Sequence, residues 1–454
     1  MRKLLAIYLA ICSTAFLCTS CFNDDEEEIV TSPFAALTSF SIGSFRVYTP
    51  GTTLEGKDTT YTKIVPGSFY PFIIDQKSRE VYNPDSLPMG ADVTKLTTGV
   101  ACDGLAYFYT DSTDTYTSVS SSDSIDLSKP RKVFVASTSG TNIQSYTVRV
   151  NVHTLDPEKM YWQQLPGASL ATPQRAIIAD DRMLLFGLNA EGARMMVALP
   201  LDNAEAVPTP VELSGGVIDL SGIQQFSGSL YADDGSGALY SSADGINWSS
   251  VPVSASIKKL IASQGSGESR LWAVTAADSI AYSTDGTNFV SVQKLDENFP
   301  LHNLSVALYP LRTNPNILRT VITGYAVDAD ASVPQVWSIL SSEKQWSHYK
   351  PAGDGTFDAP ALKPLSVVHY DNALYAFGGA GVVAGETVDA FETIYLSRDN
   401  GLSWKPLVNI KLPAELAGKN VPFVASVDKE NYLWIVAGGE KPVVWRGRIN
   451  RLAF

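Results

Sequence analysis

Alternating apolar and polar residues divide the first third of the chain into short predicted strands. A period of two runs through residues 37–47, 69–74, 131–136 and 146–152, and clusters of Ser, Thr, Asp and Gly separate these runs. Such alternation is typical of strands that bury one face. Residues 34–153 are therefore expected to form one all-β module, and about 120 residues suit a seven-stranded sandwich.

The remaining two thirds of the chain repeat one kind of apolar strand, in which Leu precedes an aromatic and a small residue. Clear or degraded copies lie at residues 183–187, 229–232, 270–274, 319–324, 373–379 and 432–439. Similar strands at a spacing of about 40–50 residues are the signature of a β-propeller, in which each copy belongs to one blade. The pattern predicts an all-β chain with six blades.

A polar turn follows four of these strands, and its clearest copy is Ser397–Trp404. Asp399 can accept hydrogen bonds from the N–H groups that follow it, and the Ser397 hydroxyl can brace the same turn. Gly401 permits a positive φ, and Trp404 can pack its ring beside the turn. Weaker copies occur at residues 242–248, 283–289 and 341–346.

The spacing Ser-x-Asp-x-Gly-x-x-Trp resembles the Asp-box of sialidase-like β-propellers, which is a structural motif. Two copies lack one residue between Asp and Gly, and the copy at 341–346 lacks both. The last two strands of the repeat also resemble kelch repeats. The expected box residues are Ser242, Asp244, Gly245, Trp248, Ser283, Asp285, Gly286, Phe289, Ser397, Asp399, Gly401 and Trp404.

The two ends of the predicted propeller are expected to meet. Residues 421–454 contain three strand patterns and lack a fourth, whereas residues 161–165 resemble the strands that follow the boxes and have no blade of their own. We therefore expect 161–165 to complete the last blade of a propeller that spans residues 160–454. Such closure protects sheet edges that would otherwise favour aggregation.

The N-terminal residues resemble a bacterial lipoprotein signal. Arg2 and Lys3 precede the apolar run 4–17, and Cys21 precedes the acidic run 24–28. The resemblance implies a signal peptide at 1–20, lipidation of Cys21 and an acidic tether at 21–33. The acidic run also resembles the surface-export signal of Bacteroidota-type lipoproteins, although a solvated spacer is the alternative. An outer-membrane protein held by its lipid anchor and facing the cell exterior is expected.

Composition narrows the possible partners. The 454 residues are 45% hydrophobic and 18% charged, with a formal net charge of -13. Proteins that bind nucleic acid need basic patches, and this chain has none, so a nucleic-acid partner is not expected. Once Cys21 is lipidated, Cys102 has no disulfide partner in the chain, and a buried small hydrophobe is its expected role.

The N-terminal module resembles the immunoglobulin-like modules found near the start of such lipoproteins. The resemblance rests on residues 86–96, 133–137 and 145–152. A spacer that lifts the propeller from the membrane is favoured over a ligand site. The whole chain thus resembles uncharacterised Bacteroidota lipoproteins that pair an immunoglobulin-like module with a propeller of unknown function.

Catalytic motifs are scarce. The histidines His153, His302, His348 and His369 form no zinc-binding pattern, and the sequence has neither a Gly-x-Ser-x-Gly elbow nor a phosphate-binding loop. The resemblance to sialidases would require three arginines, a Tyr–Glu pair and an acid/base Asp. The nearest match to the first arginine motif, residues 173–177, lacks the Pro that should follow Ile. The resemblance in fold therefore does not imply sialidase activity. No metal or cofactor is expected.

A binding site is expected on the propeller face opposite the boxes. In sialidase-like propellers, that face carries the loops from second to third strands and between blades, and the longest here are 295–304, 326–334, 350–360 and 378–391. Carboxylates beside aromatic rings suit sugars, although ordinary solvated loops are the alternative. The candidate ligand residues are Asp296, His302, Asp328, Asp330, Asp354, Phe357, Glu386 and Asp389.

These observations favour a non-enzymatic cell-surface protein that binds a polysaccharide, another glycan or a surface protein. A propeller-type glycoside hydrolase or lyase, sialidase-like in fold, is one alternative. A scaffold in a surface assembly is another.

Overall fold

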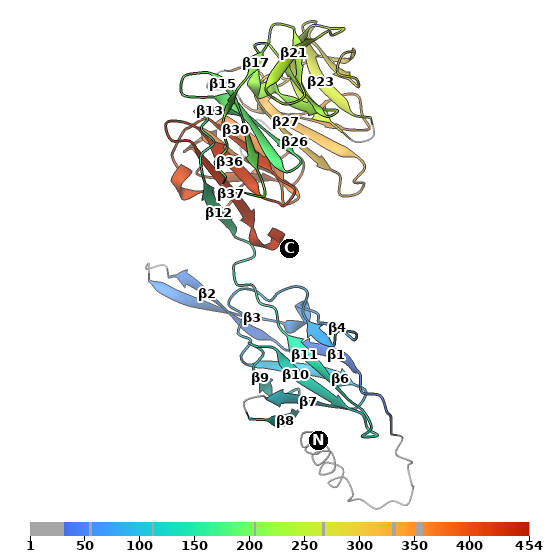
Figure 1. Cartoon of the computed structure of the whole chain (residues 1–454). Coiled ribbons are helices and arrows are strands. Elements are labelled where there is room, and N and C mark those ends of the chain that lie inside the picture. Colours follow the sequence, from blue (N-terminus) through green and yellow to red (C-terminus); the bar gives the residue numbers. More distant parts are fainter. Residues whose placement is uncertain are drawn as a thin grey trace, which may run out of the picture. The chain divides into compact units, whose positions relative to one another are not determined.

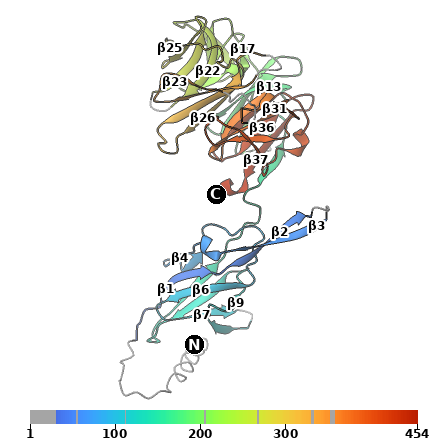
Figure 2. The same cartoon turned by 180° about the vertical axis from the view of Figure 1, so that it is seen from behind.

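The computed structural model describes residues 31–53, 57–110, 113–203, 206–265, 268–328, 333–350 and 357–453. The chain divides into two compact units, Met1–Pro157 and Glu158–Phe454 (Figures 1 and 2). The described parts of both are built from strands, turns and short 3-10 helices. The expected signal peptide and Cys21 lie outside the described residues.

Two sheets enclose the core of the first unit. One contains three strands in the order β1 (Leu37–Ile42), β6 (Leu96–Cys102) and β9 (Ser124–Ile125). The other has the order β4 (Ile73–Asp75), β5 (Glu80–Tyr82), β11 (Ile143–Arg149), β10 (Arg131–Ala136), β7 (Leu105–Thr110) and β8 (Thr115–Ser118). The 3-10 helix η2 (Gly67–Phe69) precedes β4. Leu37, Leu96, Val133 and Tyr146 are buried in one core that both sheets share, so the unit is a β-sandwich, as the alternating pattern predicts.

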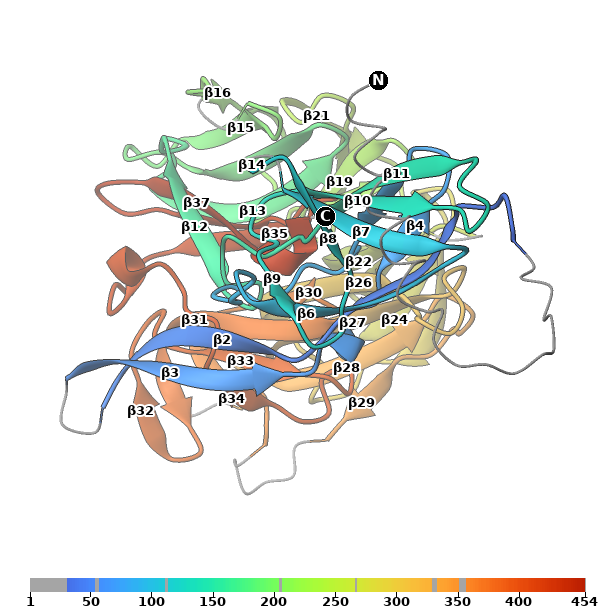
Figure 3. The ribbon, with the colours of Figure 1, turned by 90° about the horizontal axis from the view of Figure 1, so that it is seen from below.

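The expected strand at 37–47 is divided in the structure. It breaks after β1, and β2 (Phe45–Thr52) pairs with β3 (Asp58–Val65) as a separate two-stranded sheet. The base of this hairpin is buried at Phe45 and Val65, whereas Tyr61 and Ile64 are more than half exposed. The hairpin extends beyond the other strands of its unit (Figures 1 and 3).

The second unit is the predicted six-bladed propeller, and its described residues form six sheets. The first contains β13 (Thr172–Ala179), β14 (Arg182–Leu188), β15 (Arg194–Pro200) and β16 (Val211–Glu212). The second contains β18 (Gln224–Phe226), β19 (Ser229–Asp233), β20 (Leu239–Ser242) and β21 (Asn247–Val251), with β17 (Ser214–Gly215) parallel to β21. The third contains β22 (Ile257–Gln264), β23 (Arg270–Thr275), β24 (Ser279–Ser283) and β25 (Phe289–Lys294).

The fourth sheet contains β26 (His302–Pro310), β27 (Leu318–Tyr325), β28 (Gln335–Leu340) and β29 (Ser347–Tyr349). The fifth contains β30 (Ala361–Tyr370), β31 (Ala373–Val383), β33 (Ile394–Ser397) and β34 (Lys405–Leu407), with β32 (Glu386–Val388) paired to β31. The sixth contains β35 (Phe423–Val427), β36 (Leu433–Ala437), β37 (Val443–Ile449) and β12 (Met160–Leu165). The short helices are η3 (Leu220–Gly222), η4 (Ala414–Leu416) and η5 (Asn450–Ala453).

The first strand of the unit closes the last sheet. β12 pairs antiparallel with β37 from Met160 opposite Ile449 to Leu165 opposite Val444, which is the closure that the sequence predicts. A second closure lies between the first and last sheets, where Met183 and Leu185 share a hydrophobic cluster with Trp434. Both contacts join segments more than 200 residues apart, so the ring is closed by backbone pairing and by side-chain burial.

Three turns, at 242–248, 283–289 and 397–404, carry the hydrogen bonds that the sequence suggested, and we call them the box turns. In the third, Asp399 accepts from the Ser403 N–H at 2.9 Å, and the Ser397 hydroxyl oxygen accepts from the Gly401 N–H at 2.8 Å. Gly401 has a φ of 99°, and the indole N–H of the buried Trp404 donates to the Gly401 carbonyl at 3.1 Å.

The shorter box turns keep this arrangement although they lack one residue. The Ser242 hydroxyl accepts from Gly245 N–H at 2.9 Å, and the Trp248 indole donates to the Gly245 carbonyl at 3.2 Å. In the longer turn, the additional residue Asn400 adopts a left-handed φ of 64°. Asparagine tolerates that conformation, so the turn absorbs the insertion without moving the Trp away from the Gly carbonyl.

Candidate functional site

Two adjoining chambers lie along the innermost strands of the propeller. The first has a volume of about 340 Å³ and is lined by residues of β13, β26, β30 and β35. The second has a volume of about 450 Å³ and is lined by β13, β26 and the β18 and β22 regions. Arg175, Ala176, Val306 and Leu308 line both. The chambers together form what we call the central channel, and each is of a size typical of small-molecule sites.

Arg175 is the one charged side chain among the described residues that line the two chambers. Their other polar residues are Gln, Asn and Ser, together with His369. Burial lowers the pKa of His369 to about 4, against the opposing charge of Asp371, so its imidazole is neutral at pH 7. No Asp or Glu occurs among these lining residues.

A bulge in β13 places Arg175. The pairing with β14 runs from Pro173 opposite Gly187 to Arg175 opposite Phe186, so Gln174 is the extra residue. Bulges redirect the side chains that follow them. Glycine is needed at 187, because a Cβ there would lie 2.5 Å from the Thr172 carbonyl oxygen.

The guanidinium of Arg175 has few protein partners. Nη2 donates to Gln224 Oε1 at 3.2 Å, whereas Nε is buried and has no hydrogen-bond partner among the residues that the structure describes. Burial lowers the pKa of Arg175 to about 10, against the opposing charge of Asp219, so the side chain is still protonated at neutral pH. A buried donor without a partner costs free energy, and the terminal nitrogens, which make one hydrogen bond to the described residues, keep capacity to donate others.

Gln224 links the arginine to the third sheet. Its amide nitrogen donates to the Ile261 carbonyl at 3.4 Å while its oxygen accepts from Arg175. Gln224 itself is 4% exposed. Three consecutive sheets thus meet through Arg175, Gln224 and Ile261 at the wall of the channel.

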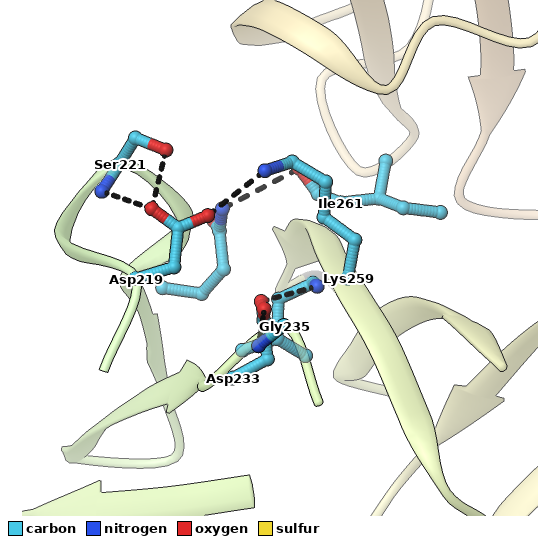
Figure 4. A network of polar contacts seen from close by, with 8 residues as sticks. Asp219, Ser221, Asp233, Gly235, Lys259 and Ile261 are labelled. Atoms are coloured by element: carbon cyan, nitrogen blue, oxygen red, sulfur yellow. Dashed lines mark hydrogen bonds and ion pairs between the residues drawn. The ribbon is translucent and has the colours of Figure 1, made fainter. Parts of the chain in front are cut away.

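The neighbouring carboxylate of Asp219 is already engaged (Figure 4). Its Oδ1 accepts from the Ser221 N–H at 3.0 Å and hydroxyl at 2.7 Å, and its Oδ2 accepts from Lys259 Nζ at 2.9 Å. Burial alone would raise the pKa of Asp219, but Lys259 and Ser221 outweigh it and the pKa is lowered. Asp219 therefore stays ionised and acts on Arg175 through its charge at longer range.

Asp233 completes this polar network. Its carboxylate accepts from the Leu260 N–H at 2.8 Å and from the Gly235 N–H at 3.1 Å. The side chain is buried, and this burial raises its pKa to about 6, with Leu260 and Lys259 opposing the shift. The network joins the second sheet to the third beside the channel, and sequence reasoning missed Asp219, Asp233, Gln224 and Lys259.

Five of the expected ligand residues lie at strand ends or loops away from the channel lining. Asp296 accepts from the Asn298 N–H at 2.8 Å, and exposed Asp328 lies 3.7 Å from Lys363 Nζ. His302 begins β26, Glu386 begins β32 and Asp389 follows it. None of the five lines either chamber. Asp330 and Asp354 lie outside the described residues.

The expectation for Phe357 is wrong. Its carbonyl accepts from the Trp404 N–H at 2.9 Å, and Lys405 Nζ lies 5.4 Å from its ring centre. Phe357 therefore lies beside a box turn instead of on the opposite face. The reason is that described residues between successive sheets lie beside the outermost strand of the next sheet and exchange hydrogen bonds with it. The Phe289 N–H likewise donates to Ser254 Oγ at 2.8 Å.

His348 and His369 are packing residues. His369 stacks on Tyr309 with ring centres 4.1 Å apart, and His348 stacks on Trp337 at 4.6 Å. Cys102 is a half-buried free thiol that donates to the Gly104 carbonyl at 3.4 Å. Within the described ranges, no group of three or more His, Cys, Asp and Glu side chains could hold a metal ion, and no helix could span a membrane.

The fold and the channel define a two-unit β protein whose propeller surrounds a polar channel, with one cationic side chain among the described lining residues. The chain belongs to the DUF6242 family: residues 156–454 match the DUF6242 beta propeller domain, and residues 40–150 match the N-terminal domain of unknown function of the same family. No curated protein matches the sequence.

Several solved structures are similar at low identity. A DUF4623 family protein from Bacteroides eggerthii is 14% identical, with 91% of this chain and 98% of that chain covered and a TM-score of 0.37. Virginiamycin B lyase from Staphylococcus aureus is 12% identical, with 64% and 99% covered and a TM-score of 0.39. The GH74 enzyme of Niastella koreensis is 13% identical, with 64% and 45% covered and a TM-score of 0.37. Similarities of this size assign no function to the chain.

Proposed function

We propose that the protein is a non-enzymatic cell-surface lipoprotein that binds a polar extracellular ligand, most simply a glycan, in the central channel of its propeller. The observation that carries this proposal is that Arg175 lines a chamber of ligand size and makes one hydrogen bond to the described protein, from Nη2 to Gln224. A ligand that accepts hydrogen bonds from its terminal nitrogens would offset part of the cost of burying the charge.

The sequence supports the location of this binding. An apolar run, Cys21 and an acidic run at the start of the chain fit a lipid anchor in the outer membrane. The N-terminal sandwich then acts as a spacer. Asp296 and Asp328, near the loops between strands, are available to contact the parts of a polymeric ligand outside the channel.

Binding is favoured over glycoside hydrolysis by the character of the lining. Glycosidases generally need two carboxyl groups about 5–10 Å apart at the cleaved bond. The described residues that line the two chambers include neither Asp nor Glu. The geometry of the channel gives no comparable support to the alternative functions, which are a glycoside hydrolase, a lyase and a scaffold in a surface assembly.

A glycan array tests the proposal, with protein that lacks residues 1–20 and titration calorimetry of each hit. A chamber-filling variant, Ser366→Trp, is compared with Ser249→Trp on the exposed face of β21. We expect at least one extracellular polysaccharide to bind, a loss of at least about tenfold in affinity in Ser366→Trp, and no change in Ser249→Trp. Absence of binding to every glycan, or equal binding by both variants, contradicts the proposal.

A further inference from the structure

We infer that the ligand of the central channel carries a carboxylate group, as a sugar acid does, and that Arg175 binds this carboxylate. The inference rests on the proposed function and adds the charge of the ligand to it. It also assigns a specificity-determining residue to the propeller.

The first argument is charge. Arg175 is the one charged side chain among the described lining residues, and it lies where the two chambers meet. The nearest carboxylate in its network, Asp219, already accepts from Lys259 and Ser221. A cation in a partly desolvated site is favourable only with an anionic partner. An anionic ligand can therefore take the position of this partner beside Arg175.

The second argument is the geometry of the guanidinium group. It carries five N–H donors in a plane, and the described part of the protein uses one of them, from Nη2 to Gln224. Nε is covered by protein, so the terminal nitrogens are the donors that a ligand can reach. A carboxylate matches the planar fork of arginine better than a hydroxyl does. Gln224 fixes the orientation of the group before the ligand arrives.

The third argument is the neutral remainder of the channel. Gln174, Asn303, Ser366 and Ser426 offer amide and hydroxyl groups, and Val306 and Leu308 offer apolar surface. Hydroxyl groups and the C–H faces of a sugar ring need this mixture. One cation among neutral polar groups suits a ligand with a single negative charge at the site and many hydroxyl groups.

The alternative role for Arg175 is structural, because it also connects β13 to β18. One hydrogen bond of 3.2 Å and an unpartnered Nε make a poor structural link. Lys259 in the same network, by comparison, holds Asp219 at 2.9 Å. The arrangement suits a residue that completes its contacts when a ligand binds.

The test compares acids with matched esters. Trisaccharides of glucuronic, galacturonic and mannuronic acid, each with its methyl ester, are titrated into the protein lacking residues 1–20. Glucose 6-sulfate provides a second anion. The variants are Arg175→Gln, Arg175→Lys and the control Arg182→Gln, whose side chain is exposed on β14 of the same blade.

We expect at least one acid to bind about tenfold more tightly than its ester, and Arg175→Gln to remove that preference. Arg175→Lys should retain part of it, because the charge remains but the planar fork is lost. Arg182→Gln should behave as the wild type. If Arg175→Gln does not fold, the affinities of the wild type for each acid and its ester decide whether the ligand carries a carboxylate.

Three results would overturn the inference. Equal binding of acids and esters that Arg175→Gln does not change refutes the carboxylate while the proposed binding function stands. Binding of the sulfate alone refutes the carboxylate class. No binding of any acid at 10 mM, alongside a neutral hit on the glycan array, also refutes this inference and leaves the proposed function intact.

Discussion

The box turns and the central channel differ in how completely their polar groups are hydrogen-bonded. In the box turn at 242–248, Asp244 accepts from the N–H groups of Ile246 and Asn247, both at 2.8 Å, and the Trp248 indole donates within the turn. In the channel, the described residues give Arg175 one hydrogen-bond partner and leave its buried Nε without any. A fully satisfied network rigidifies a fold, whereas an incompletely satisfied one is suited to a ligand.

The degraded copy at 341–346 sharpens this contrast. It has no glycine to offer its carbonyl, and the buried Trp346 indole N–H has no partner. The Trp ring is still buried against Trp272 and Phe299. The packing of the repeat thus persists without the indole hydrogen bond of the box turns, and we expect ring burial to be the larger stabilising contribution.

Trp404→Ala should have the largest effect on the box-turn side of the comparison. The side chain is 2% exposed and belongs to the cluster between the fourth and fifth sheets. Its removal should lower the free energy of unfolding by about 3–5 kcal/mol, measured by urea denaturation. Leu402→Ala, at a residue 60% exposed in the same turn, should change it by less than about 0.5 kcal/mol. Equal effects of the two substitutions would show that ring burial does not hold the blade.

On the channel side of the comparison, the carboxylate of Asp233 should make the free energy of unfolding depend on pH. Burial raises its pKa to about 6, so its contribution to stability is present below about pH 4 and is lost as the pH rises through 6. Relative to Asp233→Asn, the wild type should lose about 2–3 kcal/mol between pH 4 and pH 7. The measurement is urea denaturation across this range.

Asp234→Asn is the control for this titration. Ser236 and neighbouring N–H groups outweigh burial and lower the pKa of Asp234. Its contribution is therefore present above the unfolded pKa and lost as the pH falls, which is the opposite slope. A difference between wild type and Asp233→Asn that stays flat from pH 4 to pH 7 would contradict the account of Asp233.

Asp244→Ala should have a smaller effect than Trp404→Ala. It removes acceptors of the Ile246 and Asn247 N–H groups from an exposed turn, where water can replace part of them. We expect a loss of about 1–2 kcal/mol in the free energy of unfolding. Asp181→Ala, at an exposed carboxylate of the first blade, should change it little. A loss in Asp244→Ala no greater than in this control would mean that the turn hydrogen bonds are unimportant.

The sequence predicted the parts of the fold that depend on local patterns. Strand alternation and turn chemistry are local, so the six sheets, the turn at Ser397–Trp404 and the closing strand at 161–165 could be recognised. The break between β1 and β2 and the position of Phe357 could not, because both depend on hydrogen bonds to distant strands.

The channel site was harder to predict from the sequence. Arg175, Gln224 and Lys259 come from three different sheets, and nothing in the residues around them signals that they belong to one polar network. Arg175 attracted notice only as part of an incomplete arginine motif. The unusual feature was a charged residue in β13, which is otherwise neutral, and its role could be inferred only from the neighbours that the folded ring brings to it.

The most direct test of the contrast between the box turns and the central channel is the free energy of unfolding of Arg175→Met, measured without ligand. Methionine fills a similar volume without charge, so removing an incompletely paired cation should leave the free energy of unfolding unchanged or raise it, as is common at binding sites. Measured by urea denaturation beside Asp244→Ala, Arg175→Met is predicted to be at least as stable as the wild type. A loss of more than about 2 kcal/mol would show that Arg175 holds the propeller together, and would contradict its assignment to a ligand.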